Sequence, residues 1–168
     1  MPVKVRVLAM VLAAASISGT ALSQDRIADL RTRMEREPNP VNRAKLMPPL
    51  GDAEFAAIDA DVMQGKLAEA LAILQTYRDE VQACDKALDA LGQDAAKHPS
   101  GYKQLEFSLR DSLRRLDAVV VSMTGDEQAP FLDIRKELTE MNTHLIEHLF
   151  PHDPHAKQDH PAGDAAAH

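Results

Sequence analysis

The chain contains one cysteine, Cys84, no tryptophan, and only two tyrosines and four phenylalanines among 168 residues. A single cysteine forms no intramolecular disulfide, so a fold of this size depends on its apolar core, a metal or a partner. The same count excludes a Cys-x-x-Cys-His haem attachment, a multi-thiolate zinc site and a lipoprotein cysteine at a leader cleavage site. The scarcity of aromatic rings argues against stacking surfaces for sugars or nucleic-acid bases.

Clustered positive charge is scarce as well. The chain carries 19 Lys and Arg residues against 26 Asp and Glu residues, a formal net charge of −7. Its one arginine cluster, Arg110 with Arg114 and Arg115, is interleaved with Asp111 and Asp117. Nucleic acid and anionic membrane surfaces both require concentrated basic charge, so neither is an expected partner.

Long apolar runs are also missing. The longest, residues 7–15, is too short to span a bilayer, which needs about 20 apolar residues. Lys4 and Arg6 precede this run, and small residues around Ser23 suit a cleavage site. We therefore predict a signal peptide over residues 1–23. The mature protein is expected in the periplasm or outside the cell, without a transmembrane anchor after cleavage.

Residues 24–150 carry hydrophobic residues at helical spacing, and no stretch alternates at period two. The segment 66–91 shows a coiled-coil-like a/d pattern over four heptads, formed by Leu67, Ala70, Leu74, Tyr77, Val81, Cys84, Leu88 and Leu91. Segments 102–123 and 131–148 repeat this pattern. We predict one all-α domain, an antiparallel helical bundle of three long helices. Such seams can close within one chain or between copies, so a homo-oligomer stays open.

Shorter helices are expected before residue 66. The segment 24–37 shows helical spacing, and Asn39 is expected to cap a short helix that follows it. Pro48-Pro49 and the nearby Gly51 are expected to end that helix. Asp52 is then the predicted N-cap of the next one.

The C-terminal segment, residues 151–168, holds histidine, aspartate, proline and small residues without an apolar period. It buries too little apolar surface to offset its ordering entropy, so we predict a disordered tail. Imidazole and carboxylate groups in such a tract suit Zn²⁺, Ni²⁺ or Cu²⁺. The residues to test for metal binding are the contiguous set His144, His148, His152 and His155.

His144, Glu147 and His148 match the His-x-x-Glu-His arrangement of inverted zinc peptidases, in which two histidines four residues apart share a helix face. These enzymes need a third ligand well downstream, and only low-complexity residues follow His148. His148 also falls on a seam position, which is typical of a core or helix-end histidine. We therefore assign no catalytic residue.

Cys84 lies on the seam of the segment 66–91, which is typical of a small buried side chain. The alternative for an exported protein is an intermolecular disulfide.

Two local patterns resemble known proteins. The run from Gly65 to Leu71 resembles the turn and second-helix start of a tetratricopeptide repeat, but it occurs once, whereas a solenoid needs about three repeats. The segment 138–142, Leu-Thr-Glu-Met-Asn, is similar to the Leu-Thr-x-x-Gln motif of periplasmic metal-stress helical proteins and departs from it at the last position.

A broader resemblance rests on four segments in order: Pro-Val-Asn-Arg-Ala-Lys-Leu at 40–46, Leu-Glu-Phe at 105–107, Arg-Arg-Leu at 114–116 and Leu-Phe-Pro at 149–151. Together they resemble a group of small exported helical proteins found in soil bacteria of the acidobacterial type. The resemblance implies a helical fold and export, and it implies no activity or cofactor.

These observations predict a non-enzymatic, exported helical protein that acts as a protein-interaction or structural module, with Arg110, Arg114 and Arg115 as one candidate contact face. The alternative is a periplasmic protein that binds or buffers metal with its C-terminal histidines. No cofactor is expected if the protein acts as an interaction or structural module.

Overall fold

The computed structural model describes residues 18–151 and is all-helical over that range. The helices are α1 (Ser18–Arg36), α2 (Pro40–Ala44), α3 (Met47–Met63), α4 (Leu67–Asp89), α5 (Ser100–Val121) and α6 (Ala129–Leu149), with a 3₁₀ turn, η1 (Gly125–Gln128), before α6. The prediction of an all-α helical bundle is confirmed. The predicted tail from residue 152 and most of the predicted signal peptide lie outside the described residues.

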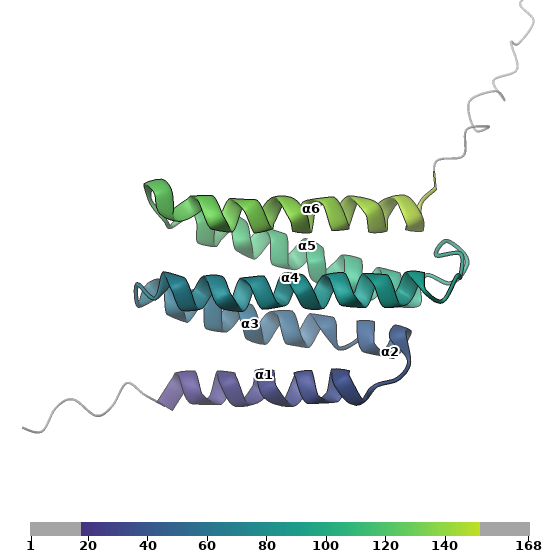
Figure 1. Cartoon of the computed structure of the whole chain (residues 1–168), viewed down its shortest axis with the longest axis horizontal. Coiled ribbons are helices and arrows are strands. Elements are labelled where there is room, and N and C mark those ends of the chain that lie inside the picture. Colours follow the sequence, from purple (N-terminus) through teal and green to yellow (C-terminus); the bar gives the residue numbers. More distant parts are fainter. Residues whose placement is uncertain (1–17, 152–168) are drawn as a thin grey trace, which may run out of the picture.

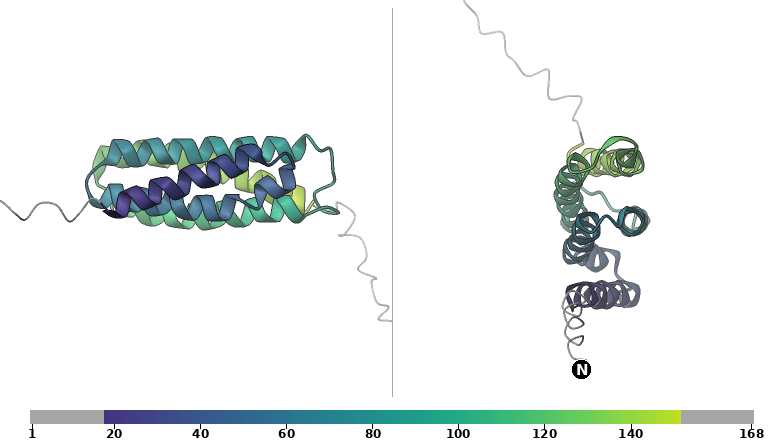
Figure 2. Two further views of the ribbon diagram at one scale, coloured as in Figure 1. Left: turned by 90° about the horizontal axis from the view of Figure 1, so that it is seen from below. Right: turned by 90° about the vertical axis from the view of Figure 1, so that its left-hand side faces the viewer.

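Successive long helices run in opposite directions and stack side by side, with α1 at one edge and α6 at the other (Figures 1 and 2). Helix α4 packs against α2, α3, α5 and α6. Because α4 and α6 run in the same direction, their C-terminal turns reach the same end of the bundle, where α5 begins. None of the described helices has the length and apolar character needed to cross a membrane.

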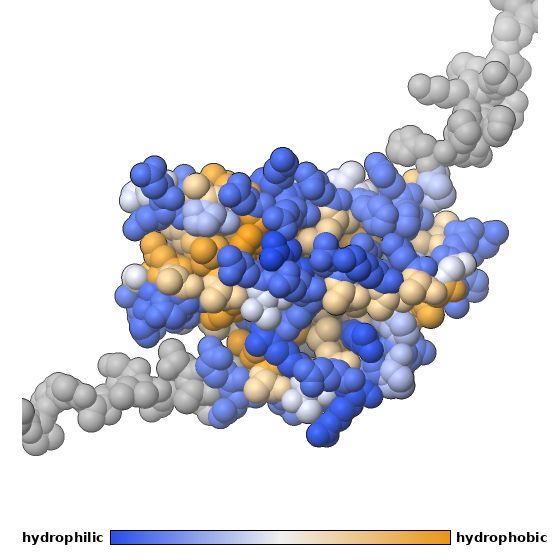
Figure 3. All heavy atoms as spheres, in the orientation of Figure 1, coloured by the Kyte–Doolittle hydropathy of each residue, from blue (hydrophilic) through white to orange (hydrophobic). Residues whose placement is uncertain are grey.

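The predicted heptad positions form the core. Six of the eight seam positions of α4 are buried: Ala70, Leu74, Tyr77, Val81, Cys84 and Leu88. Leu67 is partly buried, and Leu91 lies beyond the end of the helix, where it is exposed. On the face in Figure 3, hydrophilic side chains cover most of the surface and apolar ones lie mainly between the helices. Burial of the apolar stripe, at about 25 cal/mol per Å², is the main force that holds the helices together.

The region before α4 differs from the sequence prediction. Pro48, Pro49 and Gly51 begin α3 instead of ending a helix, because the first turn of a helix leaves its N–H groups without intrahelical partners and so tolerates proline. Asp52 consequently lies inside α3 and is not its N-cap. The predicted Asn39 cap is confirmed: its Oδ1 accepts hydrogen bonds from the backbone N–H of Val41 and of Asn42, at 2.9 and 3.4 Å.

The N-terminal helices are not all short, as the sequence had suggested. Helix α1 has 19 residues and α3 has 17, close to the 21–23 residues of the later helices. Gly65 and Gly92 sit at the two ends of α4 with φ of 72° and 61°, a left-handed conformation that glycine adopts without steric cost. These turns separate α4 cleanly from its neighbours.

A buried carboxylate in α3 was not expected from the pattern. Glu54 is fully buried, and its Oε1 accepts a hydrogen bond from Arg31 Nη2 at 2.5 Å. The same guanidinium donates from Nε to Glu80 Oε1 at 2.6 Å, so α1 bridges α3 and α4. One guanidinium thus faces two carboxylates. Burial, followed by the nearby Glu80 charge, raises the pKa of Glu54 to about 9.

Glu54→Gln tests this protonation. Glu54 holds its proton more tightly in the folded state than at its ordinary value of 4.5, so its contribution to stability is complete below pH 4.5 and is lost as the pH rises toward 9. Glutamine carries no titratable group, so the Glu54→Gln variant does not lose stability in this way as the pH rises. The melting temperature of Glu54→Gln relative to the wild type should therefore rise steadily from pH 5 to pH 9, measured by circular dichroism.

The matched control is Glu69→Gln, which changes an exposed glutamate in the first turn of α4. Its difference from the wild type should not change over the same pH range. A pH-independent difference for Glu54→Gln as well would show that Glu54 is ionised in the fold.

Candidate functional site

Two aspartates on α4 face two histidines on α6. Asp85 and Asp89 are four residues apart, and so are His144 and His148. Because the helices run in the same direction, the residues pair in order: Asp85 Oδ2 lies 3.6 Å from His144 Nδ1, and Asp89 Oδ1 lies 3.6 Å from His148 Nδ1. The two imidazole rings lie next to each other, with centroids 4.1 Å apart. Four potential metal ligands therefore line one interhelical groove.

Three of these residues could hold a single ion. Asp89, His144 and His148 each offer one ligand atom, and the three atoms lie within 4.8 Å of one another. Their side chains are 38 %, 43 % and 42 % exposed, so an ion bound here would also be reached by water. Two imidazoles and a carboxylate are ligands that Zn²⁺ and its neighbours in the first transition series accept.

Tyr102, in the first turn of α5, touches both the carboxylate and the histidine. Its hydroxyl donates to Asp89 Oδ1 at 3.5 Å, and its ring lies edge-on to His148 with centroids 6.4 Å apart. Gly101 allows α5 to begin this close to α4, since a Cβ there would lie 2.6 Å from Leu88 Cδ2 and 3.3 Å from the Cα of Val41. The close start of α5 thus helps to place the Asp89 carboxylate.

Asp85 lies deeper in the groove than the other three. Its side chain is 12 % exposed, and its Oδ1 is buried without a hydrogen-bond partner among the described residues. Burial, followed by the charge of Asp89, raises the pKa of the Asp85 carboxyl. A pocket of about 250 Å³ opens beside it, lined by Gln82, Asp85, Glu137, Glu140, Met141 and His144.

The structure brings together only part of the set predicted from sequence. His144 and His148 lie side by side, whereas His152 and His155 are outside the described residues. Of the two interpretations of His148, core or helix-end histidine, the structure fits the second: His148 lies in the last turn of α6 and its side chain is 42 % exposed. The third candidate ligand, which the sequence did not reveal, is Asp89, and it lies upstream of the histidines rather than downstream. The sequence feature that could have pointed to Asp89 is the four-residue spacing of Asp85 and Asp89, which matches that of the two histidines.

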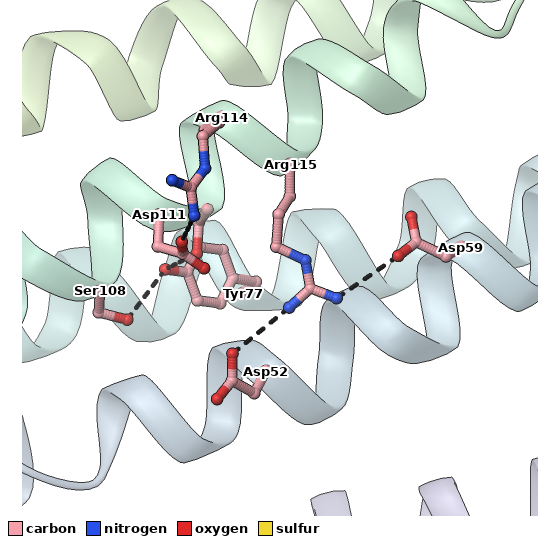
Figure 4. A network of polar contacts seen from close by, with 8 residues as sticks. Asp52, Asp59, Tyr77, Ser108, Asp111, Arg114 and Arg115 are labelled. Carbon is pink, nitrogen blue, oxygen red and sulfur yellow. Dashed lines mark hydrogen bonds and ion pairs between the residues drawn. The ribbon is translucent and has the colours of Figure 1, made fainter.

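The predicted arginine face is largely neutralised by its own surroundings (Figure 4). Arg115 reaches Asp52 Oδ1 and Asp59 Oδ2 on α3, at 3.4 Å each, and its guanidinium lies over the Phe55 ring at 5.2 Å. Arg114 pairs with Asp111 in its own helix, and Arg110 lies 3.7 Å from Glu106. Of the two interleaved aspartates, Asp111 is therefore an ion-pair partner within the cluster, whereas Asp117 pairs with Arg135 on α6.

Cys84 is buried, as the seam pattern predicted. Burial raises the pKa of its thiol to about 12, so little of the reactive thiolate forms at neutral pH. It borders a second pocket, of about 320 Å³, whose rim carries two arginines and two glutamates: Arg31, Glu35, Arg43 and Glu80. These features disfavour the intermolecular disulfide.

Comparison of the chain with protein-family models, with curated proteins and with solved structures gives no match. The groove between α4 and α6 is therefore the feature of this chain that points to a function.

Arg115→Ala tests whether the arginine contacts are structural. The substitution uncovers the fully buried Phe55 ring and removes the bridge to two carboxylates of α3, so we expect a loss of about 1 kcal/mol of unfolding free energy. Arg114→Ala is the matched control, because the Arg114 side chain is 80 % exposed and should change stability by less than about 0.5 kcal/mol. Urea unfolding measures both; equal effects would refute a structural role for Arg115.

Proposed function

We propose that this protein is an exported, non-enzymatic helical protein that binds a divalent transition-metal ion between α4 and α6. The observation that carries the proposal is the cluster of Asp89, His144 and His148, whose ligand atoms lie within 4.8 Å of one another. Export rests on the sequence of residues 1–23, and metal binding is the alternative function that the C-terminal histidines had suggested.

The donor set favours Zn²⁺, Ni²⁺, Cu²⁺ or Co²⁺ over Mg²⁺ and Ca²⁺, because the latter two prefer oxygen ligands. A structural zinc site is closed by four protein ligands, whereas these three side chains leave coordination positions open to solvent. The three side chains also lie outside the apolar core. These features support an exchangeable site, suited to metal binding or buffering.

Binding is a better interpretation than hydrolysis. The Asp89 ligand supplies what the His-x-x-Glu-His pattern lacked, but the adjoining pocket is lined by the carboxylates of Asp85, Glu137 and Glu140. Such a lining repels the anionic groups that form during attack on a carbonyl. Interaction with a protein partner stays a prediction; it is compatible with metal binding, since the groove occupies one end of the bundle.

Single substitutions of the three ligands test the proposal. Isothermal titration of full-length protein with Zn²⁺ should show a site with one ion per chain, and the ion should raise the melting temperature by linkage. His144→Ala, His148→Ala and Asp89→Ala should each weaken binding by at least about tenfold, because each removes one of three protein ligands. Absence of binding to Zn²⁺, Ni²⁺, Cu²⁺ and Co²⁺ by the wild type would refute the proposal.

Further variants test whether binding depends on this site, on general surface charge or on the C-terminal tail. His98→Ala removes an exposed histidine outside the cluster, and Glu147→Gln neutralises the exposed glutamate between the two ligands; both should bind as the wild type does. The double variant His152→Ala with His155→Ala should keep the one-ion site. Loss of that site in the double variant alone would place the binding in the tail instead.

A further inference from the structure

Asp85 is not one of the three residues that share a common ion position, yet it is the most buried member of the groove. A carboxylate at this depth is costly to bury unless its oxygens find partners. Its Oδ2 faces His144 Nδ1 at 3.6 Å, and its Oδ1 has no hydrogen-bond partner among the described residues. The packing of the bundle gives no reason for a charged residue at this position.

Histidines that bind metals usually donate their second ring N–H to a carboxylate or carbonyl, which fixes the ring and makes the coordinating nitrogen more basic. Asp85 stands where such a carboxylate would be, one helical turn before Asp89 and on the Nδ1 side of His144. A closure of a few tenths of an ångström brings the 3.6 Å separation into the usual range of about 2.7–3.2 Å.

We propose that Asp85 is a positioning residue for the metal site: it accepts a hydrogen bond from His144 Nδ1–H and thereby directs Nε2 of His144 toward the ion. This inference rests on the proposed metal binding. In the same way, Tyr102 donates to Asp89, so two of the three ligands have a partner behind them. Asp85 therefore sets the affinity of the site without being a ligand.

A positioning role and a structural role predict opposite effects on the metal-free fold. If Asp85 mainly stabilised the bundle, its replacement would lower the melting temperature of the metal-free protein. If it serves the metal, Asp85→Asn relieves a buried and incompletely paired charge, and the metal-free melting temperature stays the same or rises. Metal affinity should nevertheless fall by about 10- to 100-fold, the usual effect of losing an outer partner.

The experiment measures both quantities on full-length wild type, Asp85→Asn, Asp85→Ala and Glu140→Gln. Glu140 lines the same pocket but is exposed and lies outside the cluster, so its variant controls for the lost negative charge. Zn²⁺ affinity should decrease in the order wild type, Asp85→Asn, Asp85→Ala, because asparagine can still accept the Nδ1–H bond. Glu140→Gln should bind like the wild type.

The visible absorption of bound Co²⁺ is a measurement that a change in the stability of the fold does not by itself alter. This absorption depends on the geometry of the ligands, so the bands of Co²⁺-loaded Asp85→Ala should shift from those of the wild type, with Asp85→Asn intermediate. Equal Zn²⁺ affinities and unchanged Co²⁺ bands in all four proteins would overturn the role of Asp85 and leave the proposed metal site intact. A wild type that binds neither ion would overturn the proposed function itself.

Discussion

The register between α4 and α6 is the constraint on which the site depends. Both helices run in the same direction, and each presents acidic or imidazole side chains four residues apart, so that one packing arrangement aligns two Asp–His pairs at 3.6 Å. A shift of one residue along either helix would rotate its two aspartates or its two histidines away from the groove by about 100°. That register is held by fully buried side chains on both helices, among them Leu88 on α4 and Leu145 on α6. The core thus positions the polar groove beside it.

The same bundle contains two deeply buried carboxylates with different kinds of partner. Glu54 faces an arginine, with Glu80 competing for the same guanidinium, and the arrangement ties α1 to α3 and α4. Asp85 faces only an imidazole, which is a weaker partner unless it is protonated or bound to a metal. Each carboxyl group keeps one buried oxygen, Glu54 Oε2 and Asp85 Oδ1, without a hydrogen-bond partner among the described residues. The difference lies in the other oxygen: Glu54 Oε1 accepts a hydrogen bond from Arg31 at 2.5 Å, whereas Asp85 Oδ2 lies 3.6 Å from His144 Nδ1, so a closer approach of His144 would give Asp85 a hydrogen bond that it lacks.

Much of the fold could be predicted from the sequence, because seven-residue spacing reports directly which face of a helix is buried. The seams of α4, α5 and α6 were identified in this way, and so was the Asn39 cap. Pro48 and Pro49 were misjudged, since the same residue that stops a helix also starts one. Periodicity does not report which helices are neighbours, so His144 and His148 were recognised as candidate ligands while Asp89 was not.

Openness distinguishes this groove from a structural metal centre. Three ligands at about 40 % exposure leave room for water or for a ligand from another molecule, and an ion held there can leave without unfolding the bundle. A closed site would couple metal binding to folding, as in small zinc domains. Here none of the three candidate ligands belongs to the apolar core, so we expect the bundle to fold without an ion. Affinity at such a site is instead controlled by the residues behind the ligands, and Asp85 and Tyr102 are the two side chains in that position.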